Sequence, residues 1–286
     1  MHRFSEPVHK IQIDQRAQPV CRLCSEREYM GYGRKIILVI CLIVFVGSAG
    51  TLLNYFIGGM RAQSAFEDLS RMKTEREDLK TDKGTVIGKY ADLYLANDDI
   101  IGWVTIDDTK IDFPVMQTQN DPEYYLYVNF NNEYSDSGTP FMDAASDIFI
   151  PTSNFMIYGH NMKNGTMFHD LLKYADEEFY DEHKTFKFDT IYKGGQGTYE
   201  VLAVCYSQIY PKDSNKFKYY QYAGMTSESD FNEFVKNIKA MSEYDTGVTA
   251  EYGDQLVTLS TCAYHVDDGR FFVVGKRIDA KQVKPQ

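Results

Sequence analysis

A cysteine and an arginine eight residues apart are placed where a nucleophile and an oxyanion donor could act together. Cys262 ends an apolar, β-prone run, residues 255–262, and Arg270 lies at the start of a second such run, residues 269–276. If the two runs pair as antiparallel strands, Cys262 and Arg270 are cross-strand neighbours with Cβ atoms about 4.5–5.5 Å apart. The guanidinium could then bind a carbonyl oxygen as it becomes negative, and it would favour the thiolate of Cys262. The spacing therefore predicts nucleophilic chemistry at the open end of a hairpin.

A thiol nucleophile also needs a group that carries protons, and histidine is the usual one. His160 comes shortly after a predicted strand, residues 154–158, and Gly159 beside it lets the backbone approach closely. His169 and His183 lie in charged, helix-like or loop surroundings, and His265 lies in the predicted hairpin loop. The residues alone favour His160 without excluding the others.

Two structural roles for Cys262 compete with that of a nucleophile. The side chain could be a small apolar filler at a strand end. It could also form a disulfide with Cys205, the one other cysteine beyond residue 41, in an oxidising compartment. Composition alone leaves all three interpretations open.

Eight short β-prone runs must position these side chains. They are residues 100–106, 110–117, 138–142, 154–158, 184–191, 198–209, 255–262 and 271–278. Short strands separated by turns favour a barrel or a sandwich over a sheet of βαβ units. We therefore expect a mainly β fold with helices added to it.

Helical periodicity is confined to a few segments. Residues 61–83 predict a stalk helix, and shorter helices are expected over residues 90–95 and 166–173. A longer helix is expected from Ser227, which has capping-box spacing to Asp230. Its apolar stripe, which would pack on the barrel, is Phe231, Phe234, Val235, Ile238 and Met241.

One uncharged run of 22 residues, 36–57, is long enough to cross a membrane. At ~1.5 Å per residue it reaches about 33 Å, against a hydrocarbon core of about 30 Å. Seven Lys/Arg and four acids precede it, so the positive-inside rule predicts a cytoplasmic N-terminus. We expect a tail (1–35), a transmembrane helix (36–57), a stalk helix region (58–90) and an extracytoplasmic catalytic domain (91–286). A cleaved signal peptide is the rival interpretation, but this apolar region is long for one.

Charge and cysteine spacing exclude other classes of partner. The formal net charge of −11 argues against nucleic-acid binding, which needs a basic surface. Cys21 and Cys24 form a lone CxxC, half of a zinc site at best, so we predict neither a metal nor a cofactor. Two reduced cytoplasmic cysteines are the simpler interpretation.

Several of these segments resemble one known family, the class B sortases. TLSTC (258–262), followed by Arg270 and by VVGK, is similar to their active-site hairpin, although the family usually has VVAK. IYGHNM (157–162), with MFHDLLKY just after it, resembles their histidine segment. ANDDIIGWVTIDDTKIDFPVMQ and YYLYVNFNNEYSDSGTPFMD resemble the first part of their barrel and the segment that follows. The resemblance runs from about Asp92 to Ile278.

The resemblance implies an eight-stranded sortase-type barrel with a helix before its last two strands. It also implies a membrane-anchored cysteine transpeptidase without metal or cofactor. Such enzymes cleave a C-terminal sorting signal of surface proteins after threonine, often an NPxTx- or PPxTG-like signal. They hold the product as a thioester, which an amine, typically of the peptidoglycan precursor, then resolves. By motif, Cys262 is the nucleophile, His160 the general acid and base, and Arg270 the oxyanion stabiliser, while Ser260 and Thr261 line the peptide groove.

Two other functional interpretations accompany this one. A cysteine protease could use the same three residues and transfer the acyl group to water. A non-catalytic surface-binding protein would pair Cys262 with Cys205. Diversion of product by an added amine tests the first, and a count of free thiols tests the second.

Overall fold

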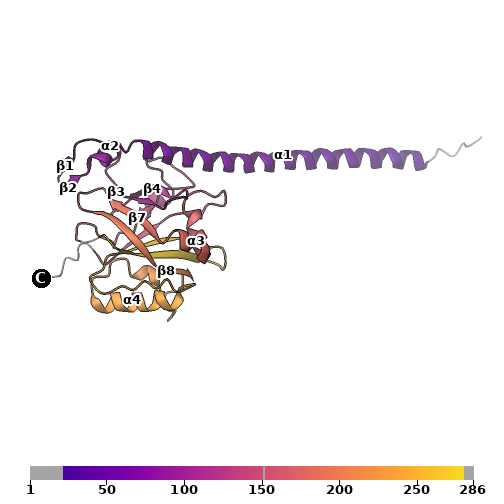
Figure 1. Cartoon of the computed structure of the whole chain (residues 1–286). Coiled ribbons are helices and arrows are strands. Elements are labelled where there is room, and N and C mark those ends of the chain that lie inside the picture. The colour runs from indigo at the N-terminus through magenta and orange to yellow at the C-terminus, as the bar shows by residue number, and fades with distance from the viewer. Residues whose placement is uncertain (1–21, 151, 280–286) are drawn as a thin grey trace, which may run out of the picture. The chain divides into compact units, whose positions relative to one another are not determined.

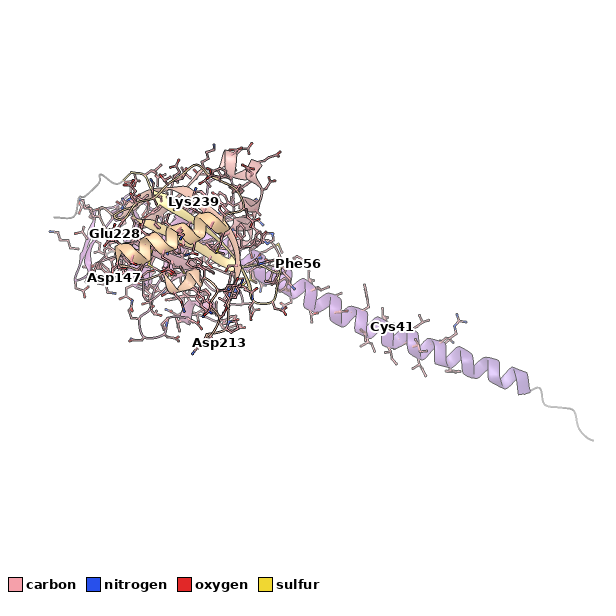
Figure 2. The ribbon with its side chains drawn as sticks, turned by 90° about the horizontal axis from the view of Figure 1, so that it is seen from below. Cys41, Phe56, Asp147, Asp213, Glu228 and Lys239 are labelled. Carbon is pink, nitrogen blue, oxygen red and sulfur yellow. The ribbon has the colours of Figure 1, made fainter. Side chains whose placement is uncertain are left out.

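The computed structural model describes residues 22–150 and 152–279, and it divides the chain into two compact units, Met1–Tyr55 and Phe56–Gln286. Helix α1 (Arg22–Arg71) contains the whole predicted span (Figure 1). Its part from Tyr32 is long and apolar enough to cross a membrane, with a most apolar window of mean hydropathy 2.8 and no buried residues. Cys41 lies exposed on this segment (Figure 2). The segment is therefore a candidate membrane span. The prediction for Cys21 lies outside the described residues, as does the side chain of Cys24.

The last turns of α1 pack in the second unit. Phe66 and Leu69 are buried, and the Phe66 ring meets the Phe113 ring edge-on at 4.9 Å. Burying side chains of this size stabilises the folded state by roughly 1.5–3 kcal/mol each. The Ser70 hydroxyl donates to Asp112 at 2.6 Å. Phe66 and Leu69 therefore face the core of the second unit.

The predicted helix over residues 61–83 is too long, since α1 ends at Arg71. The chain instead forms a small hairpin of β1 (Leu79–Thr81) and β2 (Gly84–Val86). Gly84 has φ +140°, which glycine adopts without strain, and Val86 is fully buried and bridges Tyr192. Because the buried side chain of Val86 fixes β2 against the domain, the β1–β2 hairpin takes the place of the last part of the predicted helix.

Eight strands of the described residues form a closed barrel, as the family resemblance implies, in the order β10-β8-β7-β3-β4-β5-β6-β9. They are β3 (Ile100–Thr105), β4 (Asp112–Met116), β5 (Phe141–Met142), β6 (Asn154–Tyr158), β7 (Thr185–Thr190), β8 (Gln196–Gln208), β9 (Leu256–Cys262) and β10 (Gly269–Arg277). Neighbouring strands are antiparallel except β4–β5 and β6–β9. The parallel contact of β6 with β9 brings distant parts of the sequence together.

Short helices join the strands. They are η1 (Gly88–Tyr90), α2 (Ala91–Ala96), η2 (Tyr124–Leu126), η3 (Phe168–Ala175), α3 (Glu177–Glu182) and η4 (Tyr219–Gln221). The helix predicted over residues 166–173 is thus a 3₁₀ helix shifted along the chain. The predicted helix over residues 90–95 matches α2 closely.

Helix α4 (Glu228–Met241) lies between β8 and β9 in sequence, as predicted, and covers the outside of the barrel (Figure 1). Ser227 caps it by accepting from the Asp230 N–H at 3.1 Å. Phe231, Phe234 and Ile238 are buried in a second core cluster with strand residues. Figure 2 labels Glu228 and Lys239 near the two ends of this helix. Helix α4 packs against β8, and β9 is buried along all its residues except Cys262, which is half-buried.

Candidate active site

Cys262 and Arg270 are direct partners in the β9–β10 register, as their spacing predicts. The hairpin loop between them is closed by a bond from Ala263 N–H to the Gly269 carbonyl at 2.9 Å. A Cβ on Gly269 would lie 2.1 Å from the Ala263 carbonyl oxygen, so only glycine fits there. Both Cys262 and Arg270 are half-buried. The hairpin thus holds a partly accessible thiol beside a cation.

His160 follows β6, which pairs with β9 on the edge opposite to β10. The parallel register pairs Tyr158 with Ser260, and Gly159 N–H donates to the Ser260 carbonyl at 3.1 Å. His160 follows Tyr158 by two residues, and Cys262 follows Ser260 by two residues. A Cβ on Gly159 would lie 2.7 Å from the Phe168 ring, which explains the glycine before the histidine. Because β9 lies between β6 and β10, His160 and Arg270 flank Cys262.

The hydrogen-bond partner of one His160 nitrogen shows that this nitrogen carries a proton. Nε2 lies 2.8 Å from the Leu126 carbonyl oxygen, and since a carbonyl only accepts, Nε2 must carry a proton and donate. The ring also contacts exposed Tyr127 at 5.5 Å between centroids. Nδ1 is therefore the nitrogen left for exchange of a proton.

The other three histidines of residues 22–150 and 152–279 have different surroundings. His183 stacks on Phe179 at 4.0 Å, and its Nδ1 lies 2.9 Å from the Phe179 carbonyl oxygen. Exposed His265 packs edge-on against Tyr206 at 4.7 Å. The side chain of His169 bonds to Asn161 at 2.8 Å. The strand pairing thus brings His160 level with Cys262.

The Arg270 guanidinium donates to main-chain oxygens of Asp268 and Gly269, at 3.2 and 3.0 Å. Within the described part of the chain no carboxylate pairs with it. Burial raises the pKa of Tyr219 to about 12, with the bond to Ser260 and the charge of Arg270 acting against that rise. Burial, and then Asp143, likewise raise the pKa of Tyr158. Arg270 is therefore an unneutralised cation among neutral phenols.

Ser260 and Thr261 are both buried, and their hydroxyls have partners within the protein. The Ser260 and Tyr219 hydroxyls are 2.7 Å apart, and Thr261 Oγ1 donates to the Gly159 carbonyl at 2.6 Å. In this structure Ser260 links β9 to Tyr219, and Thr261 links β9 to the main chain just before His160. Their contact with a bound peptide stays a prediction.

The predicted alternative of a Cys205–Cys262 disulfide is wrong, because both cysteines are free. Cys205 pairs with Phe272 across β8 and β10, so β10 lies between the strands of the two cysteines. Its Sγ lies 3.4 Å from the Ile238 carbonyl oxygen, and burial raises the pKa of this thiol. Cys205 is thus a core residue.

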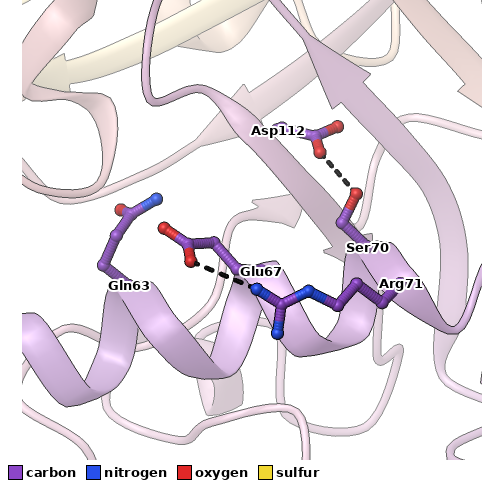
Figure 3. A pocket seen from close by; sticks show the side chains of 5 residues that line it. All are labelled: Gln63, Glu67, Ser70, Arg71 and Asp112. Carbon is purple, nitrogen blue, oxygen red and sulfur yellow. Dashed lines mark hydrogen bonds and ion pairs between the residues drawn. The ribbon is translucent and has the colours of Figure 1, made fainter.

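A pocket of about 310 Å³ beside α1 is lined by polar side chains, namely Gln63, Glu67, Ser70, Arg71 and Asp112 (Figure 3). Ser70 donates to Asp112, whose charge is paired with Lys73 at 3.2 Å, and Arg71 pairs with Glu67, so the charges of this pocket are balanced within the protein. Within residues 22–150 and 152–279, no three His, Cys, Asp or Glu side chains are grouped to hold a metal.

Comparison with known proteins gives the family. The Sortase domain model matches residues 104–278. The chain is 33% identical to sortase B of Listeria monocytogenes, over 86% of this chain and 96% of that one, and 27% identical to sortase B of Staphylococcus aureus, over 85% and 95%. The crystal structure of Bacillus anthracis sortase B in complex with AAEK1 superposes with a TM-score of 0.65 at 30% identity, covering 79% of this chain and all of that one. A Staphylococcus aureus sortase B–substrate complex gives 0.64 at 26% identity, covering 77% and 97%. The chain belongs to the sortase family, and within it to class B.

Sequence reasoning missed three groups that contact the site residues, namely Leu126, Asn161 and Tyr219. Leu126 and Tyr219 lie in segments far from the motifs, and they contact the site through a carbonyl and a phenol. Asn161 stands inside the IYGHNM motif directly after His160, and the motif itself was the available signal.

Proposed function

We propose that this protein is a membrane-anchored cysteine transpeptidase that transfers surface proteins to an amine acceptor of the cell wall. The observation that carries the proposal is the pairing of β9 with both β6 and β10, which sets His160 and Arg270 on the two sides of Cys262. Membership of class B supports it, because sortases act on proteins that carry sorting signals.

In the first half-reaction, the sulfur of Cys262 attacks the carbonyl carbon of the threonine before the scissile bond. The C–N bond breaks, a thioester forms, and His160 gives a proton to the departing amine. The Arg270 guanidinium stabilises the oxyanion of the tetrahedral intermediate. Nδ1 of His160 is suited to this exchange, since Nε2 donates to Leu126.

In the second half-reaction, an amine attacks the thioester. The C–S bond breaks, a new amide forms, and His160 takes a proton from the incoming amine. Cys262 is released as it began. The acceptor is an amine of the peptidoglycan precursor or another primary amine, and the donor is a surface protein with an NPxTx- or PPxTG-like signal.

The orientation in the membrane is part of the proposal. The excess of Lys and Arg before residue 36 supports an N-terminus in the cytoplasm and a catalytic domain outside. Protease added to intact, wall-stripped cells should digest the catalytic domain and spare the tail. Recovery of a protein that starts near residue 50 in the medium would contradict the anchor.

The activity is tested with the full chain in detergent and a library of sorting-signal peptides. An acyl-enzyme at Cys262, detected by mass, is expected, and an added amine such as hydroxylamine or triglycine should divert product from hydrolysis to ligation. Cleavage that no amine diverts would instead make the protein a cysteine protease. No acyl-enzyme with any peptide would count against both.

Replacing Arg270 by lysine is expected to lower turnover by about 10²–10³, the usual loss on removal of one oxyanion donor. Lysine keeps the charge but lacks the planar set of donors, so affinity for the peptide should change less. Arg277→Lys, seven residues further along β10, is the matched control and should keep most of the activity. Near wild-type turnover in Arg270→Lys would contradict the oxyanion role.

A further inference from the structure

A chain of two side-chain hydrogen bonds reaches Cys262 from a residue outside the proposed catalytic trio. Asn161 Nδ2 lies 2.9 Å from the Cys262 carbonyl oxygen, and Asn161 Oδ1 lies 2.8 Å from His169 Nδ1. Asn161 is only 5% exposed. A buried amide with both of its ends bonded is held in a single orientation.

The direction of each bond follows from the chemistry of its atoms. The Cys262 carbonyl can only accept, so the nitrogen of the Asn161 amide must face it. The amide oxygen then faces His169, and His169 Nδ1 must carry a proton to donate. His169 therefore selects the amide orientation that places a donor on Cys262.

The two hydrogen bonds of Asn161 lie just beyond the end of the β6–β9 pairing. Regular pairing of β6 with β9 ends at Tyr158 and Ser260. Beyond it, Thr261 Oγ1 holds the Gly159 carbonyl, and Asn161 holds the Cys262 carbonyl. His160 lies between these two links, so the backbone on each side of it is tied to β9.

A second segment, the start of η3, also bonds to His160 and Asn161. The N–H of Phe168, at the start of η3, donates to the His160 carbonyl at 2.9 Å. His169 is the next residue, so η3 fixes both the His160 main chain and the Asn161 side chain. The separation of His160 from Cys262 is thereby set by a few hydrogen bonds past the end of the ladder.

We propose that Asn161, oriented by His169, is a positioning residue that fixes the main chain of Cys262 relative to His160. The proposal rests on the proposed function for its consequence in turnover. It predicts that loss of the Asn161 donor impairs the chemical step more than peptide binding, because misplacing reacting groups by about 1 Å can cost about 10²-fold in rate.

The test uses the full chain in detergent and the isosteric variant Asn161→Asp. Aspartate keeps an oxygen toward His169 but sets a second oxygen against the Cys262 carbonyl, where the two repel. We expect kcat to fall about 10²-fold while KM changes less than about threefold. Asn237→Asp is the matched control, because it makes the same change on α4, where the amide donates to the Glu233 carbonyl. It should leave both constants unchanged.

The role of His169 is tested through rescue. His169→Ala should lower kcat about tenfold in the wild-type background and cause no further loss in Asn161→Ala, because coupled residues are not additive. His169→Asn should restore most of the rate, since its amide nitrogen lies about where Nδ1 does. Equal losses in the two backgrounds would overturn the coupling of His169 to Asn161.

Reaction of Cys262 with iodoacetamide, followed by peptide mass, gives a readout that needs no substrate. We expect Asn161→Asp to slow this alkylation several-fold and Asn237→Asp to leave it unchanged. If the wild-type protein forms no acyl-enzyme, the proposed function fails, yet the alkylation rates still decide the positioning role. Unchanged alkylation, or a wild-type kcat in Asn161→Asp, would overturn it. A loss matched by a lower melting temperature and a smaller alkylatable fraction would also overturn it, by making the effect one of folding.

Discussion

Cys262→Ala is expected to remove acyl-enzyme formation completely and to leave the fold intact. The change deletes the sulfur that would form the thioester, and no neighbouring group can replace it. The side chain lies half-buried at the end of β9, so its loss leaves the closed barrel and both core clusters in place. Mass spectrometry after incubation with peptide measures the covalent product, and circular dichroism measures the fold.

Cys205→Ala is the control for this experiment. The Cys205 thiol is buried on β8 behind β10, so its removal should keep most of the activity. Equal loss of activity in the two variants would contradict the assignment of Cys262 as the nucleophile.

His160→Ala should lower turnover toward the upper end of the ~10²–10⁴ range that acid–base catalysis contributes. Without the imidazole the leaving amine has no positioned proton donor, and the acceptor amine has no base. The loss should therefore exceed that of Arg270→Lys. Single-turnover rates of acyl-enzyme formation, with and without an amine acceptor, measure the two half-reactions separately.

His265→Ala is the matched control for the histidine. His265 lies in the loop after Cys262, but its ring packs on Tyr206 at the surface. Its removal should leave both half-reactions within about threefold of wild type, as surface changes usually do. A His265→Ala enzyme as slow as His160→Ala would move the acid–base role into the loop.

Local signals predicted much of the barrel. Period-two patterns located all eight strands within a few residues, and the short hairpin from β9 to β10 made Arg270 the neighbour of Cys262. The capping signal at Ser227 located the start of α4 correctly. These features depend on contacts between residues close in sequence, and such contacts can be inferred from spacing.

Contacts between distant segments could not be inferred in this way. Periodicity did not predict that β6 runs parallel to β9, so the residues alone favoured His160 without excluding the other histidines, and the family motif singled it out. The bonds of Asn161 and Leu126 depend on that pairing and on loop conformation. Other errors had readable signals that went unused. Gly84 marks the hairpin that replaces the end of the stalk helix, and Asp176 caps the unpredicted α3.

The parallel contact of β6 with β9 also bears on when the thiol joins the fold. The links from Gly159 to Thr261 and from Asn161 to Cys262 span 102 and 101 residues, and contacts of such separation form slowly. In the closed strand order, β9 and β10 together join β6 to β8. A chain whose β9 and β10 have not yet docked would therefore hold His160 in an open sheet, with β6 and β8 as unprotected edges that invite aggregation. Docking of this hairpin would close both edges and position the nucleophile in the same step, so we expect no working site in a partly folded chain.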